Sequence, residues 1–340
     1  HSQALTQLVP NTQYHFRVRS VDAAGNLAIS QDMTFATAPT MLPQPAAVYV
    51  SPSGSDTNPG TEAAPFRTIR RAQDFVRAVN ESMTSNVSVY LRGGTYQLSE
   101  PVSLTPRDSG SNGFRVQWLA YPGEVPILDG GTEITGWVPE QNGVFSAPTG
   151  GLEFLQFYVN GLRGTLARLS NTYRSMSWDV PNQKINIDPI DAAALQSLSP
   201  QQLSQVRITI LGKGVNQATL RIASISGTAI TPMEPERTLI FQQTYPPKEN
   251  RPYFLDNAFG FVNAPGEFYV DPVADRVYYK PRPGESNMAL VTAVASRLER
   301  LLSIEGTIDQ PVTNIDVSGL TFQHSGWTLP LQTGFIGDQG

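Results

Sequence analysis

The sequence predicts an all-β protein in which a right-handed parallel β-helix is capped by one helix and interrupted by a β-rich insertion, after a partial β-sandwich. Three observations support this fold class. The 340 residues include 28 glycines and 27 prolines, which fits many turns between short strands. Short runs of β-branched and aromatic residues recur between those turns. One stretch of helical spacing precedes these runs, where a solenoid needs a cap.

The composition narrows the possible partners and cofactors. The formal net charge is −5 and basic residues form no cluster, which argues against a nucleic-acid partner. Cysteine is absent, which excludes disulfides, cysteine-bound metals and thiol catalysis. No run of about 18 apolar residues is present, so we expect no membrane span. His1 and His15 have no other ligand-type residues around them, and we expect neither a metal site nor a cofactor.

Residues 1–38 alternate like strands. The stretch LVPNTQYHFRVRSVDAAGN, which includes Pro10 and Tyr14, resembles the last strands of a fibronectin type III module. The resemblance implies that the Tyr14 hydroxyl bonds back to the upstream backbone. Such a module has about seven strands, so we expect this part of one not to close its own core. An unrelated β-hairpin arm is the alternative, and the proline-rich residues 39–48 are predicted to be a stiff linker.

Residues 49–152 open with a turn-rich loop that runs into a predicted helix. In PFRTIRRAQDFVRAV the apolar residues recur at helical spacing, and Thr68 stands at the N-cap position. We expect the apolar face of this helix to cover the open end of the solenoid, which otherwise exposes strand edges and an apolar interior. The loop then satisfies backbone donors with turn residues such as Asp56 and Asn58. Two acidic residues, Asp56 and Glu62, are too few for a calcium site.

Four short β runs follow the helix. They are VSVYL at Val87, PVSL at Pro101, RVQWLAY at Arg115 and PILDG at Pro126. VSVYL and RVQWLAY are offset by about 28 residues, and PVSL and PILDG by about 25. Each pair is therefore predicted to occupy equivalent places in successive coils. An ordinary antiparallel meander is the alternative.

Residues 153–290 break this rhythm and are predicted to form an inserted β-rich domain, either a small sandwich or a barrel. FYVNGLRGTLAR indicates two strands joined by a tight Asn-Gly turn. DAAALQSLSPQQLSQ is predicted to be helical. In GEFYVDPVADRVYYKPRPGE, residues 268–270 are predicted to pair with residues 277–279 as a hairpin.

Residues 291–340 return to the coil pattern with LLSIEG and NIDVSGLTFQHS. YVSPSGSDTNPGTEAAPFRTIRRA resembles the N-terminal motif of secreted right-handed parallel β-helix proteins of the pectate-lyase-like type, which include polysaccharide lyases and glycoside hydrolases. FYVNGLRGTLAR, NAPGEFYVDPVADRVYYKPRPGE and VSGLTFQHSGW together resemble large bacterial β-helical glycoside hydrolases. This resemblance covers residues 49–340. The inward-facing candidates of the last coil are Ile315, Val317, Leu320 and Phe322.

The resemblance implies a secreted, multidomain bacterial enzyme that acts on a polysaccharide substrate. Glycoside hydrolysis usually needs two carboxylates across the scissile bond, about 5 Å apart for retention and about 6.5–9.5 Å apart for inversion. The resemblance places these acids on later coils, beyond Gly340. We therefore interpret the chain as a fragment and expect it to be inactive alone. The sugar, the linkage, the stereochemistry and the oligomeric state stay open.

Two alternative functions stay open as well. A polysaccharide lyase on the same fold binds calcium through carboxylates and abstracts a proton with Lys or Arg, and its acid clusters on one coil face are not visible in this sequence. A non-catalytic carbohydrate-binding or surface protein has a regular solenoid without carboxylates in its groove. The fold alone does not separate these functions.

Three residues within the chain are candidates for chemistry. His324, in FQHSGW, follows the last coil strand and is placed to bond sugar hydroxyls or to polarise a carboxylate. Trp327 is a candidate for stacking on a pyranose face, and Glu267, which opens a hairpin strand, is a second catalytic candidate. The alternatives are a turn histidine, a half-buried tryptophan and a surface or capping acid. Asp129, in ILDGG, is assigned to an Asx turn.

Overall fold

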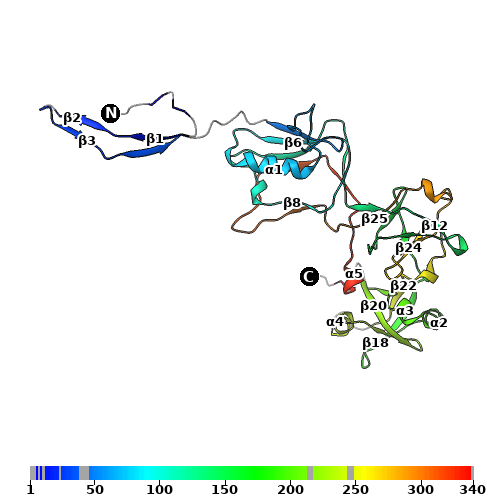
Figure 1. Ribbon diagram of the computed structural model, residues 1–340. Helices are drawn as coiled ribbons and strands as arrows, with labels where there is room; N and C mark the ends of the chain where they lie inside the picture. The colour runs from blue at the N-terminus through cyan, green and yellow to red at the C-terminus, as the bar shows by residue number, and fades with distance from the viewer. Residues whose placement is uncertain are drawn as a thin grey trace.

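Strands make up most of the regular structure, as the all-β prediction requires, and the helices are few and short (Figure 1). The computed structural model describes residues 5–6, 8–9, 12–22, 24–37, 46–212, 217–242 and 249–337. His1, Pro10 and residues 39–45 of the predicted linker lie outside the described residues.

Two antiparallel pairs form the N-terminal region. The Tyr14 hydroxyl accepts a hydrogen bond from the backbone N–H of Val9 at 2.6 Å, which is the upstream contact expected of it. Val18, Leu27 and Ile29 are about half exposed, so this region buries no complete core of its own. The paired strands are β1 (Gln13–Phe16) with β4 (Met33–Ala36), and β2 (Arg19–Val21) with β3 (Leu27–Ile29).

Three parallel sheets form the next part of the chain, and each includes a strand that follows the insertion. In the first sheet, β5 (Ala47–Val50), β6 (Val87–Leu91), β9 (Val116–Ala120) and β27 (Ile315–Ser318) lie side by side. The second sheet contains β7 (Gly94–Gln97), β10 (Pro126–Asp129) and β28 (Thr321–Gln323). The third sheet pairs β8 (Val102–Leu104) with β26 (Leu302–Ile304). Strands about 200 residues apart in sequence are thus direct neighbours.

One predicted register is confirmed and the other is wrong. Val87 pairs with Val116, so VSVYL and RVQWLAY occupy equivalent places as expected. PILD, however, pairs with GTYQ of β7 instead of PVSL. PVSL finds its partner in β26, beyond the insertion. The prediction failed because it considered only neighbouring runs, whereas the insertion separates β8 in sequence from the strand that pairs with it.

Helix α1 (Ile69–Val79) covers the apolar interior beside these sheets. Ile69, Ala72 and Val76 are buried on its inner face, as predicted. The Thr68 hydroxyl caps the helix by accepting a hydrogen bond from the backbone N–H of Arg71 at 3.1 Å. The Asp56 carboxylate accepts the backbone N–H groups of Arg67 and Thr68, both at 2.9 Å. The turn-rich loop therefore anchors the start of the helix.

We expect the Asp56 contacts to make stability depend on pH. Burial raises the pKa of Asp56, but hydrogen bonds from Thr68 and Arg67 outweigh it and hold the pKa below its usual value of 3.8. A lowered folded pKa gives stability that is present above the unfolded pKa and is lost as pH falls through the folded pKa. Urea midpoints at pH 7 and at about pH 3 should therefore differ less for Asp56→Asn than for the unmodified chain. The exposed Asp309→Asn is the control, and equal pH dependence in all three proteins would contradict the prediction.

Residues 131–166 and 267–296, most of them in the predicted insertion, form two sheets around one aromatic core. Asn160 and Gly161 both have positive φ, as the predicted Asn-Gly turn requires. Phe268 pairs with Tyr279 and Val270 with Val277, which confirms the predicted hairpin. One sheet contains β11 (Gly131–Glu133), β25 (Ala293–Ser296), β14 (Phe157–Val159) and β15 (Leu162–Arg163). The other, with mixed directions, contains β12 (Val138–Pro139), β13 (Phe145–Pro148), β24 (Arg276–Tyr279), β23 (Glu267–Asp271) and β16 (Thr165–Leu166).

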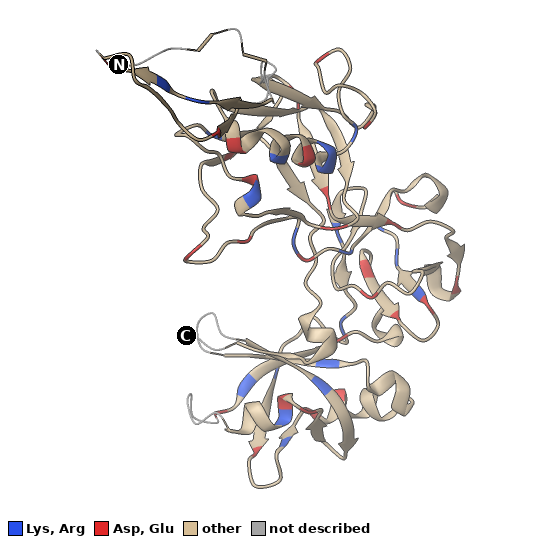
Figure 2. Ribbon diagram, turned by 60° about the vertical axis from the view of Figure 1, so that its left-hand side comes forward, with Lys and Arg blue, Asp and Glu red and all other residues tan. Residues whose placement is uncertain are grey.

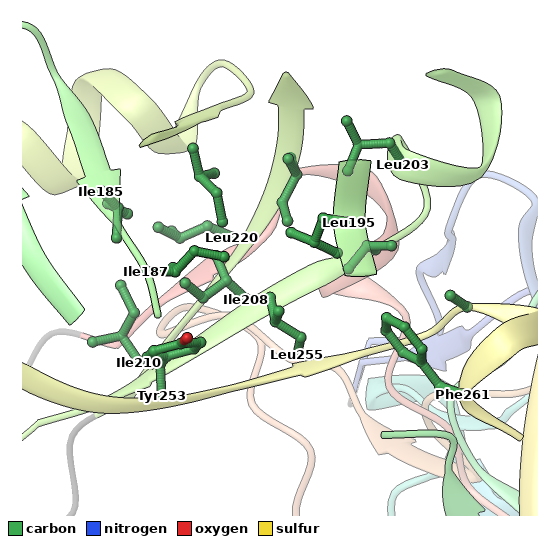
Figure 3. Packing of buried hydrophobic residues seen from close by; sticks show 14 of the residues in the cluster. Ile185, Ile187, Leu195, Leu203, Ile208, Ile210, Leu220, Tyr253, Leu255 and Phe261 are labelled. Atoms are coloured by element: carbon green, nitrogen blue, oxygen red, sulfur yellow. The ribbon is translucent and has the colours of Figure 1, made fainter. Parts of the chain in front are cut away.

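Residues 174–256 together with residues 329–336 form a small barrel, one of the two forms predicted for the insertion. Its sheet closes because β19 pairs with both β22 and β20. Its core is mainly aliphatic and includes Tyr253 and Phe261, with Leu195 of a short helix packed among strand residues such as Ile208 and Leu220 (Figure 3). The barrel strands are β19 (Arg207–Leu211), β22 (Arg251–Asp256), β17 (Arg174–Asp179), β18 (Lys184–Asn186), β21 (Ala229–Pro232) and β20 (Gln217–Ser226). Its other elements are α2 (Pro189–Gln196), α3 (Pro200–Leu203), α4 (Glu236–Gln242), α5 (Leu329–Gln332) and β29 (Phe335–Ile336).

The parallel sheets have an uncovered end opposite β5. Strands β27 and β28 are the last strands of their sheets in the described residues. Val317 and Phe322 line the apolar interior with Leu320, yet they are 37% and 42% exposed. Their inward orientation agrees with the prediction. They are exposed because, among the residues that the structure describes, no further strand covers them.

Candidate functional site

His324 lies in a cluster of polar side chains at the ends of two adjacent parallel strands. Its Nδ1 is 3.0 Å from both carboxylate oxygens of Asp129. Gln323 pairs with Asp129 in the β28–β10 register, which brings residues 194 apart in sequence together. The Gln323 amide donates to Asp129 Oδ2 at 2.9 Å, and the Gly131 N–H donates to Oδ1 at 2.8 Å. The latter contact is the predicted Asx turn, but Asp129 also holds His324.

The same cluster touches the insertion. The His324 ring centroid lies 4.7 Å from that of Tyr158 on β14. The His324 side chain is 12% exposed, and its backbone has a φ of +58°, in the left-handed region. Because carboxylate and phenol contacts fix the ring, its orientation is set before any ligand arrives. An imidazole held in this way can position another polar group through Nε2.

We expect the Asp129 contacts to contribute measurably to stability. Asp129→Ala removes acceptors for His324, Gln323 and the Gly131 N–H in a buried place. Unsatisfied buried groups cost about 1–3 kcal/mol, so the free energy of unfolding should fall by about 2–3 kcal/mol. Urea denaturation measures this difference. Exposed Glu133→Ala on the neighbouring strand should change it by less than about 0.5 kcal/mol, and equal effects of the two variants would contradict the assignment.

Trp327 follows His324 and is half-exposed at 37%. Its indole meets the Phe335 ring edge-to-face with centroids 5.0 Å apart. Its backbone N–H donates to the Gln156 side chain at 2.8 Å, which ties the segment to the insertion. Part of the ring surface therefore stays open to solvent on a fixed backbone.

Glu267 has a different environment from His324. It is only 5% exposed, and its Oε2 accepts the backbone N–H groups of Asn263 and Ala264 at 2.9 and 2.8 Å. These contacts cap its own loop, as in the alternative of a surface or capping acid, and the catalytic role stays a prediction. Its burial is explained without a substrate, and the structure shows no contact between Glu267 and the Asp129–His324 pair.

Asp256 belongs to a buried ion pair in the insertion. The Arg207 Nε lies 3.1 Å from Asp256 Oδ1, and both side chains are nearly closed to solvent. Burial raises the pKa of Asp256 above its ordinary value, while Arg207 favours the charged form. The neighbouring Asn257 donates to the backbone carbonyl of Gln205 at 2.9 Å. These contacts indicate a structural role.

A cavity that the sequence did not reveal lies between α1 and strands β7 and β8. Its volume is about 460 Å³, within the usual range for ligand pockets, compared with about 130 Å³ for a second cavity beside Arg207. Its lining is about equally polar and apolar, and the polar side chains include Arg67, Arg70, Gln73, Gln97 and Glu100. The only sequence signal for it is the polar outer face of the predicted helix. We call this cavity the α1 groove.

Charged residues do not gather into one cluster among the residues that the structure describes. Lys, Arg, Asp and Glu positions are scattered over the fold (Figure 2). Within the part of the chain that the structure describes, no three His, Cys, Asp or Glu residues are grouped to hold a metal ion. In the same residues, no helix is long and apolar enough to cross a membrane.

Comparison with known proteins identifies related chains. Residues 137–282 match the GH141 insertion domain. A solved structure described as a glycoside hydrolase superimposes with a TM-score of 0.77 at 28% identity, covering 85% of this chain and 52% of that one. Pectate lyase PEL9 of Emericella nidulans is 32% identical over 131 residues, or 36% of this chain and 30% of that protein. The uncharacterized protein YwoF of Bacillus subtilis is 34% identical over 83 residues, or 24% and 15%.

These similarities support a carbohydrate-active β-helical fold of the pectate-lyase-like type. The match to the GH141 insertion domain falls on the region where the coil pattern breaks. The chain spans about half of the similar glycoside hydrolase structure and less than a third of the pectate lyase.

Proposed function

We propose that this chain is part of a secreted, polysaccharide-degrading glycoside hydrolase whose catalytic carboxylates lie outside residues 1–340. The observation that carries the proposal is the similarity to a glycoside hydrolase structure over 85% of the chain. The GH141 insertion domain match within residues 137–282 supports the same class. The match covers 52% of that structure, so the similar protein has further residues, outside the matched part, that can carry catalytic groups.

In this proposal, the three parallel sheets are the first coils of a right-handed parallel β-helix. Their strands pair in parallel register, and a helix covers one end. The exposed apolar residues at the other end need a further coil to cover them. The domains would be a partial fibronectin type III module at 1–38, a linker at 39–48, the cap and first coils at 49–152, the insertion at 153–290 and the resumed coils at 291–340. The match at residues 137–282 favours an earlier start for the insertion.

The candidate residues then have supporting roles. Hydrolysis needs an acid that protonates the leaving oxygen and a second carboxylate that acts as nucleophile or base. The Glu267 carboxylate caps its own loop. The other candidates are the Asp129–His324 pair and the exposed part of the Trp327 ring, which would lie beside the coils that follow β28. His324 would position a substrate hydroxyl or a carboxylate through Nε2, and Trp327 would stack on a sugar face.

A polysaccharide lyase is the second candidate function. It is favoured by one observation, the 32% identity to a pectate lyase over 131 residues. A lyase eliminates across the C4–C5 bond of a uronic acid and leaves a double bond in the product, whereas a hydrolase adds water and leaves none. The product therefore separates the two functions.

The test is to incubate the longer protein that contains this chain with a panel of neutral and acidic polysaccharides. We expect new reducing ends without the ultraviolet absorbance of an unsaturated product. Absorbance that rises together with the reducing ends would replace hydrolysis by elimination. Binding without any new reducing ends would favour the non-catalytic carbohydrate-binding function.

A further inference from the structure

The sheet β11–β25–β14–β15 has an outer face whose side chains line up across all four strands. Its inner face is formed by residues such as Phe157 and Ala295, which are 0% exposed in the aromatic core. Successive side chains of a strand point to opposite faces of a sheet, so the residues adjacent to them point outwards. The strand register places four of the outward residues side by side across the sheet, in the order Glu133, Val294, Tyr158 and Arg163. We call these four residues the outer row.

The outer row adjoins the candidate site, because residues 324–327 lie on the same face of the sheet. The His324 ring is 4.7 Å from the ring of Tyr158, centroid to centroid. A Cβ on Gly326 would lie only 3.2 Å from the Cβ of Ser296, so the glycine lets this segment pack directly on the sheet. The outer row and the candidate site therefore form one continuous surface.

Three polar groups of the outer row are free to bind a ligand. They are the Glu133 carboxylate, the Tyr158 hydroxyl and the Arg163 guanidinium. Among the residues that the structure describes, none of these three groups has a hydrogen bond or an ion pair within the protein. Adjacent strands lie about 4.8 Å apart, so the backbones of Glu133 and Arg163 are separated by about 14 Å. The two charges thus stand at opposite ends of the row without neutralising each other in an ion pair.

We propose that the outer row binds an uncharged oligosaccharide that passes beside His324. A sugar hydroxyl can donate to the Glu133 carboxylate and can accept from the Arg163 guanidinium, so one neutral chain satisfies both ends of the row. An anionic sugar would be repelled by Glu133, and a cationic ligand would be repelled by Arg163. The row has no net charge that would compensate either cost. The choice of a saccharide among neutral polar ligands rests on the proposed hydrolase function.

Isothermal titration of the chain with four neutral tetrasaccharides tests the inference: galactotetraose, xylotetraose, mannotetraose and arabinotetraose. We expect at least one of them to bind. Glu133→Gln and Arg163→Ala should each weaken that binding by about tenfold or more, because each removes a hydrogen bond to a charged group. Tyr158→Phe keeps the ring against His324 and should weaken it by about threefold, through the loss of a neutral hydrogen bond. Tetragalacturonate should bind about tenfold more weakly than the best neutral tetrasaccharide.

Two exposed residues outside the outer row supply matched controls. Glu81→Gln and Arg107→Ala repeat the same chemical changes elsewhere and should leave the binding unchanged. The inference would be overturned if no neutral tetrasaccharide bound, if tetragalacturonate bound as tightly as the best of them, or if the controls lost as much affinity as the outer-row variants.

The proposed function can fail separately from this inference. If the longer protein binds a neutral tetrasaccharide through the outer row but degrades no polysaccharide, the hydrolase function is contradicted and the binding face stands. If the longer protein degrades a polysaccharide and Glu133→Gln and Arg163→Ala do not change its KM, the binding face is contradicted and the hydrolase function stands.

Discussion

Asp256→Ala is expected to lower the free energy of unfolding by about 3–5 kcal/mol, because it leaves a buried arginine without its partner. Arg207 is 3% exposed, and its Nη1 already has no hydrogen-bond partner in the structure, so the guanidinium cannot regain from water what it loses. Arg168 also interacts with Asp256, which adds to the uncompensated positive charge. Urea denaturation followed by tryptophan fluorescence measures the effect.

A double variant separates loss of the pair from loss of packing. Arg207→Met/Asp256→Leu removes both charges and keeps most of the volume. Replacing both partners of a buried pair by apolar residues is often neutral or stabilising, so the double variant should recover most of the loss. A single variant that costs less than about 1 kcal/mol, or a double variant less stable than the single one, would contradict the structural role assigned to the buried pair.

Phe157→Ala should cost about 3–5 kcal/mol, the usual range for a fully buried phenylalanine. The ring is 0% exposed and lies within 6.1 Å, centroid to centroid, of Trp137, Phe154, Phe268 and Tyr279. Phe157 lies on β14 of one sheet, and Phe268 and Tyr279 lie on β23 and β24 of the other, so the cavity would weaken the contact between the two sheets.

Leu290→Ala is the control for this prediction. Leu290 is 82% exposed and should change the free energy of unfolding by less than about 0.5 kcal/mol. A loss of less than about 1 kcal/mol in Phe157→Ala would mean that the aromatic core collapses around the vacancy or that the two sheets do not depend on it.

Local signals in the sequence predicted local structure well. The capped helix, the Asn-Gly turn and the hairpin of residues 268–279 each depend on residues close in the chain, and all three are present. The barrel was named only as one of two forms, because its closure depends on β19 pairing with β20 and β22 at the same time. No short pattern carries that information.

Contacts between distant residues were the ones that sequence reasoning missed. The Asp129–His324 pair joins residues that become neighbours only because β28 pairs with β10. Asp129 was assigned to an Asx turn alone, since its second role depends on a strand beyond the insertion. For the same reason PVSL pairs with β26, which also lies beyond the insertion, and does not align with PILD as predicted. An insertion separates in sequence the strands that pair across it, so a comparison of neighbouring runs does not predict their pairing.

The contacts of Glu267 could not be predicted from its position in a motif. It opens a strand in a hairpin that resembles those of hydrolases, but its carboxylate caps two backbone N–H groups. Sequence alone does not distinguish an acid that faces a groove from one that faces its own loop. The α1 groove was missed for a related reason, because its two walls come from separate elements.

The most direct test of the proposed function compares two proteins on one polysaccharide panel. Reducing-end release is measured for the 340-residue chain and for the longer protein that contains it. If the chain supplies only the capped coils and the insertion, the longer protein should release reducing ends from at least one polysaccharide and the chain alone should release none. Clear turnover by the chain alone would place the catalytic carboxylates within residues 1–340, and inactivity of both proteins would contradict the hydrolase function.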